Sequence, residues 1–191
     1  WRDEGAFTGE VSARQLAGLV EYALVGHSER RHVFRETDKD IRAKMQAAVR
    51  NGITPILCVG ETAHERSENE TDAILHDQIV GGLANLTSEE VKDVVIAYEP
   101  VWAIGTGTPA TPHDVEKAVR TIRRQVEHLY GTTAGDSVRV LCGGSTSPAS
   151  AKSFLETPGV NGLLPGGASL KLQEFNEMVE IAHKVGRGKK A

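Results

Sequence analysis

Apolar residues in this chain gather into five short, uninterrupted runs, separated by longer segments with helical periodicity. The runs are Tyr22–Gly26, Ile53–Gly60, Val94–Tyr98, Val138–Cys142 and Gly162–Leu164. Because these runs are continuous rather than alternating, they predict strands that are buried on both faces.

The segments between the runs carry the signals of amphipathic helices. Thr37 precedes one of them as an N-cap, with Asp40 three residues later, and Thr111-Pro112 and Ser147-Pro148 each place a cap before a proline. Three further helices are predicted from periodicity alone: Ser12–Leu19, Thr71–Leu83 ending at Gly81-Gly82, and Leu170–Val185.

Strand and helix signals therefore alternate along the whole chain. This alternation predicts a parallel α/β sheet with right-handed crossovers, either doubly wound or rolled into a barrel. No low-complexity linker interrupts it, so residues 1–191 are expected to form a single domain. Glycines and polar residues follow each predicted strand, and parallel α/β folds place their chemistry at that end of the sheet.

Composition narrows the function classes. Apolar residues make up 39% and charged residues 25% of the chain, which is typical of a globular protein, and the net charge of −4 offers no basic surface for nucleic acid. No apolar run is long enough to span a membrane and no signal peptide is visible at Trp1, so a cytoplasmic protein without a membrane partner is expected. The two cysteines, Cys58 and Cys142, are expected to be buried free thiols rather than metal ligands.

Two glycine-rich segments follow consecutive predicted strands near the C-terminus. Gly143-Gly144-Ser145 allows close backbone approach and adds a hydroxyl, and Gly166–Ser169 leads from a strand into a helix. Free backbone N–H groups at such positions attract anions, and phosphate is the natural ligand. The alternative is that each segment is simply a tight turn.

A histidine and a glutamate follow two other strands. His27 and Glu99 lie 72 residues apart in sequence, yet both belong to the carboxyl end of the predicted sheet. A carboxylate base with a histidine electrophile or proton shuttle suits proton abstraction next to a carbonyl group. The alternatives are a structural histidine and a salt bridge from Glu99 to Arg30 or Arg31.

Six sequence motifs together resemble the triosephosphate isomerase family. They are Gly5–Glu10 (GAFTGE), Val25–Arg31 (VGHSERR), Pro55–Glu61 (PILCVGE), Ala97–Gly107 (AYEPVWAIGTG), Gly143–Ser145 (GGS) and Gly162–Leu170 (GLLPGGASL). They span almost the whole chain in the order that the family shows.

This resemblance implies a TIM-type βα barrel and an isomerase of glycolysis and gluconeogenesis. Such an enzyme interconverts dihydroxyacetone phosphate and glyceraldehyde 3-phosphate, uses no cofactor or metal, and takes a small phosphorylated triose as its partner molecule. Carried over to this chain, the catalytic residues are Glu99, which moves the proton, and His27, which polarises the carbonyl oxygen. The phosphate would be held by Gly105, Ser145, Gly166 and Gly167.

The resemblance also implies a lid and two supporting residues. The lid, which closes over the substrate, matches Pro100, Val101, Trp102, Ala103, Ile104, Gly105, Thr106, Gly107 and Thr108. Thr8 matches a loop that reaches into the neighbouring subunit of a homodimer, and Glu29 matches a residue that pairs with a catalytic lysine.

The chain departs from the family pattern in extent. Eight βα units take about 250 residues, whereas five strands are visible here, so an incomplete, open TIM-type barrel corresponding to strands 4–8 of the family is expected. The family's catalytic asparagine and lysine belong to the first strand, and no lysine of this chain follows a predicted strand. Activity that is strongly impaired or absent is therefore expected, since losing even one preorganised donor costs roughly 10²–10³ in rate.

Two substitutions fit an open barrel. Cys142 stands where the family has a tyrosine whose hydroxyl steadies the closed lid, so weaker closure is expected. Pro165 replaces a valine, which suits a strand at the edge of a sheet. The exposed flanks of such a barrel predict a homo-oligomer.

Two further functions stay open. The first is a non-catalytic open-barrel fragment that retains a phosphate-binding site, and the second is another phosphate-binding barrel enzyme.

Overall fold

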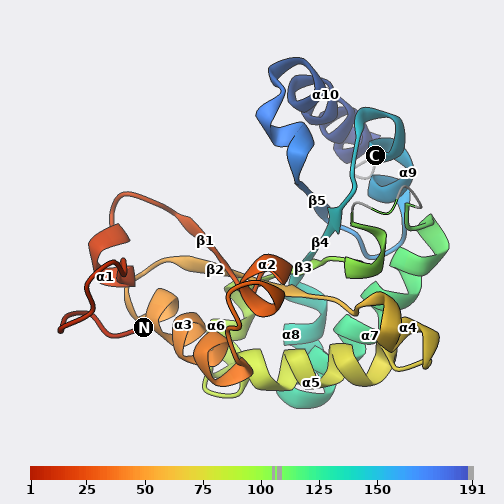
Figure 1. Cartoon of the computed structure of the whole chain (residues 1–191). Coiled ribbons are helices and arrows are strands. Elements are labelled where there is room, and N and C mark those ends of the chain that lie inside the picture. The colour runs from red at the N-terminus through yellow and green to blue at the C-terminus, as the bar shows by residue number, and fades with distance from the viewer. Residues whose placement is uncertain (105, 107–108, 189–191) are drawn as a thin grey trace.

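Each of the five apolar runs forms a strand, and the strands pair in sequence order. The computed structural model describes residues 1–104, 106 and 109–188. Within them the sheet has the order β1-β2-β3-β4-β5, with every neighbouring pair parallel. The strands are β1 Tyr22–Val25, β2 Thr54–Val59, β3 Val95–Tyr98, β4 Arg139–Gly144 and β5 Gly162–Pro165. Figure 1 shows that they curl into an open half-barrel.

The six helices predicted from capping and periodicity are present, with adjusted ends. They are α1 Ala13–Leu16, α3 Asp38–Arg50, α5 Thr71–Leu83, α7 Pro112–Tyr130, α9 Pro148–Glu156 and α10 Leu172–Gly188. Capping boxes begin α3 at Thr37 and α7 at Thr111, as their sequences predict. The predicted helix at Ser12–Leu19 is shorter, because α1 closes only one turn.

The sequence analysis did not predict the short helices. They are α2 Ser28–His32, α4 Ala63–Ser67, α6 Ser88–Asp93 and α8 Thr132–Ser137, together with the 3₁₀ turns η1 Val101–Ala103 and η2 Gly167–Leu170. One or two turns contain too few residues to establish a 3.6-residue hydrophobic period, so sequence periodicity gives no signal for them.

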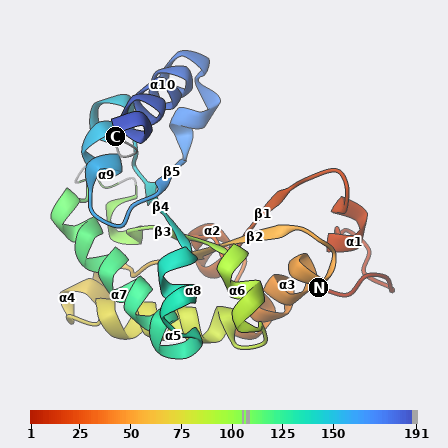
Figure 2. The same ribbon diagram turned by 180° about the vertical axis from the view of Figure 1, so that it is seen from behind.

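The hydrophobic core lies between the convex face of the sheet and the surrounding helices. Ile41 of α3, Leu75 of α5 and Ile122 of α7 are fully buried against Leu57 and Ile96 from the central strands. Seen from behind, α3, α5, α7 and α8 lie over this convex side (Figure 2). The strands thus hold their carboxyl ends in a fixed register while the helices supply most of the buried apolar surface.

The expectation that all strands are buried on both faces is wrong for β1. Tyr22 and Leu24 are 45% and 52% exposed, whereas every residue of β3 is buried. Tyr22 and Leu24 alternate along β1 and so share one face, which is left uncovered at this edge of the open half-barrel. Pro165 lies in β5, at an edge, where a residue without an N–H donor is tolerated.

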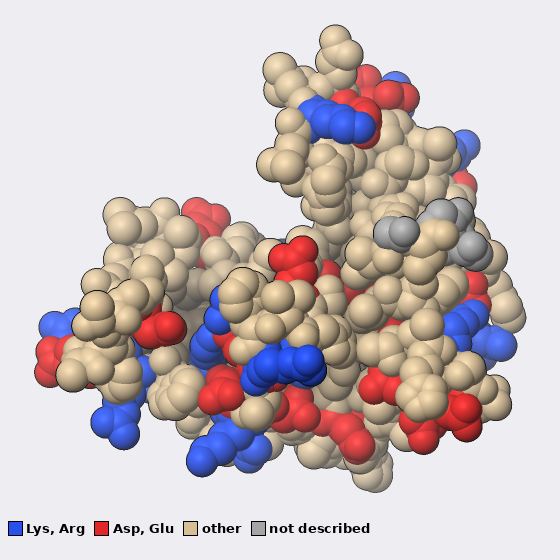
Figure 3. Space-filling model, viewed as in Figure 1, with Lys and Arg blue, Asp and Glu red and all other residues tan. Residues whose placement is uncertain are grey.

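Charged and apolar surfaces are distributed unevenly. Side chains of both signs cover the helices α3, α4 and α5, whereas the surface around β5 and the segment that follows it is largely uncharged (Figure 3). On α10 an exposed apolar stripe runs through Leu172, Phe175 and Val179. No helix in the described ranges has the length and apolarity needed to cross a membrane.

Both cysteines are free and buried, which confirms the sequence prediction.

Candidate active site

His27 and Glu99 meet at the carboxyl end of the sheet. His27 follows β1 and forms the N-cap of α2, while Glu99 follows β3, two strands away. The His27 Nε2 atom lies 2.8 Å from the Glu99 Oε1 atom. The predicted proximity of the two groups is thus confirmed as a direct contact.

Local backbone contacts define which nitrogen of His27 carries a proton. The Glu29 N–H, in the first turn of α2, donates a hydrogen bond to His27 Nδ1 over 3.3 Å. A ring nitrogen that accepts a hydrogen bond is unprotonated, so the proton of the neutral ring lies on Nε2. His27 therefore donates from Nε2 to Glu99, and the same N–H is available to a substrate carbonyl oxygen once that contact opens.

Burial tunes the Glu99 carboxyl group. The residue is 3% exposed, and burial raises its pKa, while His27, the Ser28 N–H and the Arg31 charge partly counteract that rise. Ser28 N–H donates to Glu99 Oε2 over 3.1 Å. A carboxylate that is desolvated yet held by a backbone donor is a stronger base than one in water, as proton abstraction from carbon requires.

The salt bridge considered for Glu99 is replaced by the contact with His27. Arg31 instead donates to the carbonyl oxygens of Gly26 and Cys58 and pairs with Asp38, and Arg30 pairs with Glu36. These contacts hold the loop after β1 against β2, and so they fix the position of His27.

Two glycines on the neighbouring strands make room for Glu99. A Cβ atom at Gly143 of β4 would lie 3.1 Å from Glu99 Cγ, and one at Gly60, after β2, would lie 1.7 Å from the Glu99 carbonyl oxygen. The contact at Gly60 excludes any side chain, whereas the one at Gly143 would force the Glu99 side chain to shift. Gly143 was interpreted from sequence as part of a phosphate loop, so this second role was missed.

The predicted phosphate-binding residues lie at the ends of β4 and β5. Ser145 Oγ donates to the Ala103 carbonyl oxygen of η1 over 3.2 Å, and Gly166 and Gly167 are exposed at the start of η2. A Cβ atom on Gly166 would lie 3.9 Å from the Gly144 carbonyl oxygen, so the two glycine segments are adjacent. The fourth predicted residue, Gly105, lies outside the described residues, as do Gly107 and Thr108 of the lid.

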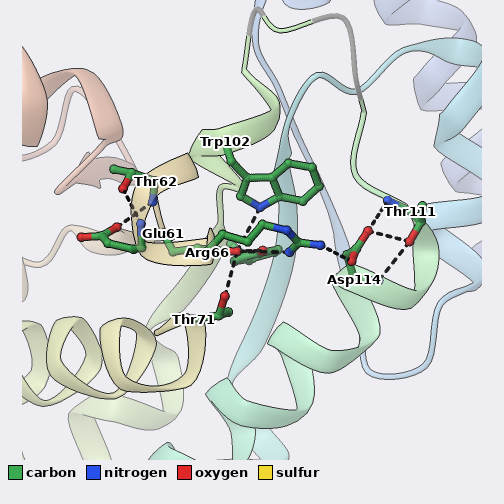
Figure 4. Close-up of polar contacts among 9 residues, drawn as sticks. Glu61, Thr62, Arg66, Thr71, Trp102, Thr111 and Asp114 are labelled. Atoms are coloured by element: carbon green, nitrogen blue, oxygen red, sulfur yellow. Dashed lines mark hydrogen bonds and ion pairs between the residues drawn. The ribbon is translucent and has the colours of Figure 1, made fainter. Parts of the chain in front are cut away.

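A buried carboxylate, Glu61, holds the beginning of the lid segment. Its side chain is fully buried after β2 and accepts hydrogen bonds from Trp102 Nε1 at 2.9 Å, from the Tyr98 hydroxyl at 3.1 Å and from Thr71 Oγ1 at 3.3 Å. Burial raises the pKa of Glu61, and the contacts with Tyr98, Arg66 and Trp102 oppose that rise. Figure 4 shows this cluster, in which Arg66 also reaches Asp114 of α7.

The sequence places Glu61 at the end of a motif and directly after a predicted strand, and its role was not predicted. Its position directly after a strand was the available signal, because an acidic residue there must be either solvated or bound by donors.

The two supporting residues are both exposed. Thr8 lies in the turn before α1, and Glu29 lies in the first turn of α2. The Glu29 carboxylate makes no ion pair with the portion of the chain that the structure describes. No group of three or more His, Cys, Asp or Glu side chains in that portion could hold a metal ion.

Comparison with known proteins agrees with this architecture. Residues 1–182 match the family profile described as triosephosphate isomerase. A protein named triosephosphate isomerase from Geotalea uraniireducens is 45% identical over 183 residues, which cover 95% of this chain and 73% of the relative. Proteins of the same name from Carboxydothermus hydrogenoformans and Solibacter usitatus are each 47% identical, over 93% and 95% of this chain and 71% and 73% of the relatives.

Proposed function

This chain belongs to the triosephosphate isomerase family, an isomerase family, and from that premise we propose that its site interconverts dihydroxyacetone phosphate and glyceraldehyde 3-phosphate. The observation that supports the proposal most directly is the 2.8 Å contact between His27 Nε2 and Glu99 Oε1 at the carboxyl end of the sheet. On this proposal the five strands correspond to strands 4–8 of the family barrel. The protein would act in the cytoplasm.

The proposed reaction transfers one proton between adjacent carbons. The Glu99 carboxylate removes a proton from the hydroxymethyl carbon of dihydroxyacetone phosphate and returns it to the former carbonyl carbon. His27 Nε2–H donates to the carbonyl oxygen, which stabilises the negative charge of the enediolate as it develops, and the ring then passes the hydroxyl proton from one substrate oxygen to the other, so that the hydroxymethyl group becomes the aldehyde. His27 and Glu99 are hydrogen-bonded to each other in this structure, so this contact must open before both side chains can act on the triose.

The phosphate group of the substrate would bind at the ends of β4 and β5. Ser145, Gly166 and Gly167 offer a hydroxyl and backbone N–H groups about one strand away from the catalytic pair, as the parallel order of β3, β4 and β5 requires. Gly105 completes this proposed phosphate set. The lid over Pro100–Thr108 would exclude water and protect the enediolate.

For the 191-residue chain alone we propose strongly impaired or absent turnover. Every lysine in the described ranges lies within a helix or, for Lys171, directly before one, so none stands at a strand end beside His27. Glu29, which the resemblance pairs with a catalytic lysine, has no cation on its carboxylate in the described residues. A developing oxyanion would lack its cationic donor, at a cost of roughly 10²–10³ in rate or more.

The test measures two properties of the same purified chain. Isomerase turnover is assayed at micromolar protein in both directions, with Glu99→Gln as the variant that removes the base, and inorganic phosphate binding is measured by calorimetry, with Ser145→Ala as its variant. Weak turnover that E99Q abolishes would support the proposal. Turnover close to that of an intact relative would contradict the proposed impairment.

The alternative function is a non-catalytic open half-barrel that binds phosphate. One observation favours it: Gly166 and Gly167 are exposed, while no lysine in the described ranges stands at a strand end beside His27. Phosphate binding that S145A weakens, together with turnover no greater than that of E99Q, would favour it.

We also propose that the chain self-associates through its open flanks. The edge strand β1 exposes Tyr22 and Leu24, and α10 exposes Leu172, Phe175 and Val179. Apolar patches of this kind, next to an unpaired strand edge, are stabilised by burial against another copy. The resulting interface would differ from the family dimer that involves the loop around Thr8.

A further inference from the structure

The side chain of Arg66 bridges two parts of the chain that lie twelve residues apart in sequence. Arg66 belongs to α4, and its guanidinium lies 4.0 Å from the centre of the Trp102 ring. The same group forms an ion pair with Asp114 Oδ1 at 2.7 Å and a longer one with Glu61 Oε1 at 3.5 Å. Trp102 lies in η1, at one end of the lid segment, and Asp114 lies in the first turn of α7, just beyond its other end.

Trp102, near the start of that segment, and Thr111, just beyond its end, are each held by a group that Arg66 contacts. At the first end, Trp102 Nε1 donates to the buried Glu61 carboxylate. Beyond the other end, Asp114 Oδ2 accepts hydrogen bonds from the Thr111 N–H at 2.9 Å and the Thr111 hydroxyl at 2.6 Å, which caps α7. Arg66 thus stacks on one anchor and forms an ion pair with the other, as Figure 4 shows.

The chemistry of the arginine suits this task. A guanidinium is planar and always charged, so one face can stack on an indole while its edge donates to two carboxylates. The Arg66 side chain is 37% exposed, whereas Glu61 is fully buried and the Asp114 side chain is 18% exposed. The interaction with Glu61 is therefore poorly screened by water, and the cation offsets the buried negative charge.

We propose that Arg66 is a positioning residue that couples the two ends of the lid segment, so that the placement of Trp102 depends on the ion pair between Arg66 and Asp114. The inference rests on the proposed function only in interpreting Pro100–Thr108 as a lid. Because Trp102 is three residues after Glu99, the same coupling also restrains the backbone that carries the proposed base.

Fluorescence of Trp102 tests the coupling without any need for turnover. The chain has two tryptophans, so Trp1→Phe leaves Trp102 as the single reporter. In that background, acrylamide quenching is compared for the parent, Arg66→Met, Asp114→Asn and the double variant. Asp114 makes no direct contact with Trp102 in the part of the chain described, so an effect of D114N on Trp102 must pass through another group.

We expect R66M to raise the quenching constant of Trp102 about two-fold, because the indole loses its cation and one covered face. D114N should raise it in the same direction, and the double variant should equal R66M. Equality of the double variant and R66M is what coupling through Arg66 requires, whereas independent effects would add.

Two control variants distinguish coupling through Arg66 from a general loosening of the packing around Trp102. Thr111→Val removes the hydroxyl contact of the α7 cap but leaves the ion pair between Arg66 and Asp114 in place, so Trp102 quenching should stay at the parent value. Arg120→Met removes an exposed arginine whose partner, Glu116, lies on the same helix, and it should also leave quenching unchanged.

A quenching constant for D114N equal to that of the parent would overturn the proposal, as would a T111V variant that behaves like D114N. If R66M does not fold, the comparison of D114N with T111V still decides the question. Failure of the turnover and phosphate-binding measurements would contradict the proposed function and leave this result standing.

Discussion

The Nε2–H group of His27 donates a hydrogen bond to a carboxylate oxygen of Glu99 across 2.8 Å, while Nδ1 of the same ring accepts one from the Glu29 N–H in the first turn of α2. The contact joins residues that follow strands β1 and β3, with β2 between them. The two groups are thus held by this hydrogen bond at the carboxyl end of the sheet, and the interaction restrains both side chains until a substrate replaces it.

Replacing Glu99 by glutamine should make stability less dependent on pH. Burial raises the folded-state pKa of Glu99, so folding is favoured by protonation at low pH, and this contribution is lost as the pH rises through that pKa. Glutamine keeps one oxygen acceptor, for Ser28 N–H or for His27, and removes the buried charge, and the contact that it loses costs the same at both pH values. We expect E99Q to gain about 1 kcal/mol over the parent near pH 8 and little near pH 4, measured by urea unfolding at both pH values. A gain of equal size at both values would contradict the assignment.

Thr146→Val should stabilise the chain. The Thr146 hydroxyl is buried after β4 and has no hydrogen-bond partner among the described residues, so its desolvation is uncompensated there. We expect a gain of about 1 kcal/mol in the free energy of unfolding. The matched control is Thr121→Val, because the equally buried Thr121 hydroxyl donates to Asp72 at 2.7 Å and its loss should cost about 1–2 kcal/mol. Changes of the same sign in both variants would refute the explanation.

Gly143→Ala should displace the proposed base. The new Cβ atom would press on Glu99 Cγ at 3.1 Å and on the Tyr98 carbonyl oxygen at 3.3 Å, so the Glu99 side chain must move. We expect a loss of about 1–3 kcal/mol in stability and a change in the NMR signals of the His27 ring. Gly186→Ala, at an open position in α10, serves as the control and should leave those signals unchanged.

Stability should fall in acid as Asp114 is protonated. Although burial raises the pKa of Asp114, hydrogen bonds from Thr111 and Arg66 outweigh it and lower the pKa to about 2. The stabilisation is present above the unfolded pKa of about 4 and is lost as the pH falls towards 2. We expect D114N to lose about 1 kcal/mol at pH 7 relative to the parent, with the difference vanishing near pH 2. Thermal unfolding of both proteins across this range provides the measurement.

Self-association should depend on the edge of β1. Leu24→Lys places a charge on the exposed strand and should shift the chain towards monomer in light scattering at high concentration, because burying the ammonium group is costly. Leu129→Lys changes an exposed leucine on α7, a helix that packs against the central strand β3, and should leave the mass unchanged. A parent chain that is already monomeric would contradict the proposed self-association through the open flanks of the half-barrel.

The local order of the fold follows from the sequence. Continuous apolar runs predicted the position of each strand, and the caps at Thr37, Thr111 and Ser147 predicted where three helices begin, because these signals depend only on neighbouring residues. The positions of His27 and Glu99 directly after parallel strands were also enough to predict that both lie at the carboxyl end of the sheet.

Other features depend on distant parts of the chain and were decided only by the tertiary structure. The exposure of Tyr22 and Leu24 results from the edge position of β1, since an apolar run has the same pattern whether or not a neighbour covers it. The space for Glu99 beside Gly143 and the reach of Arg66 from Trp102 to Asp114 likewise arise from packing between elements far apart in sequence. Sequence periodicity reports which face of an element is apolar, whereas packing in three dimensions determines what that face and its polar ends contact.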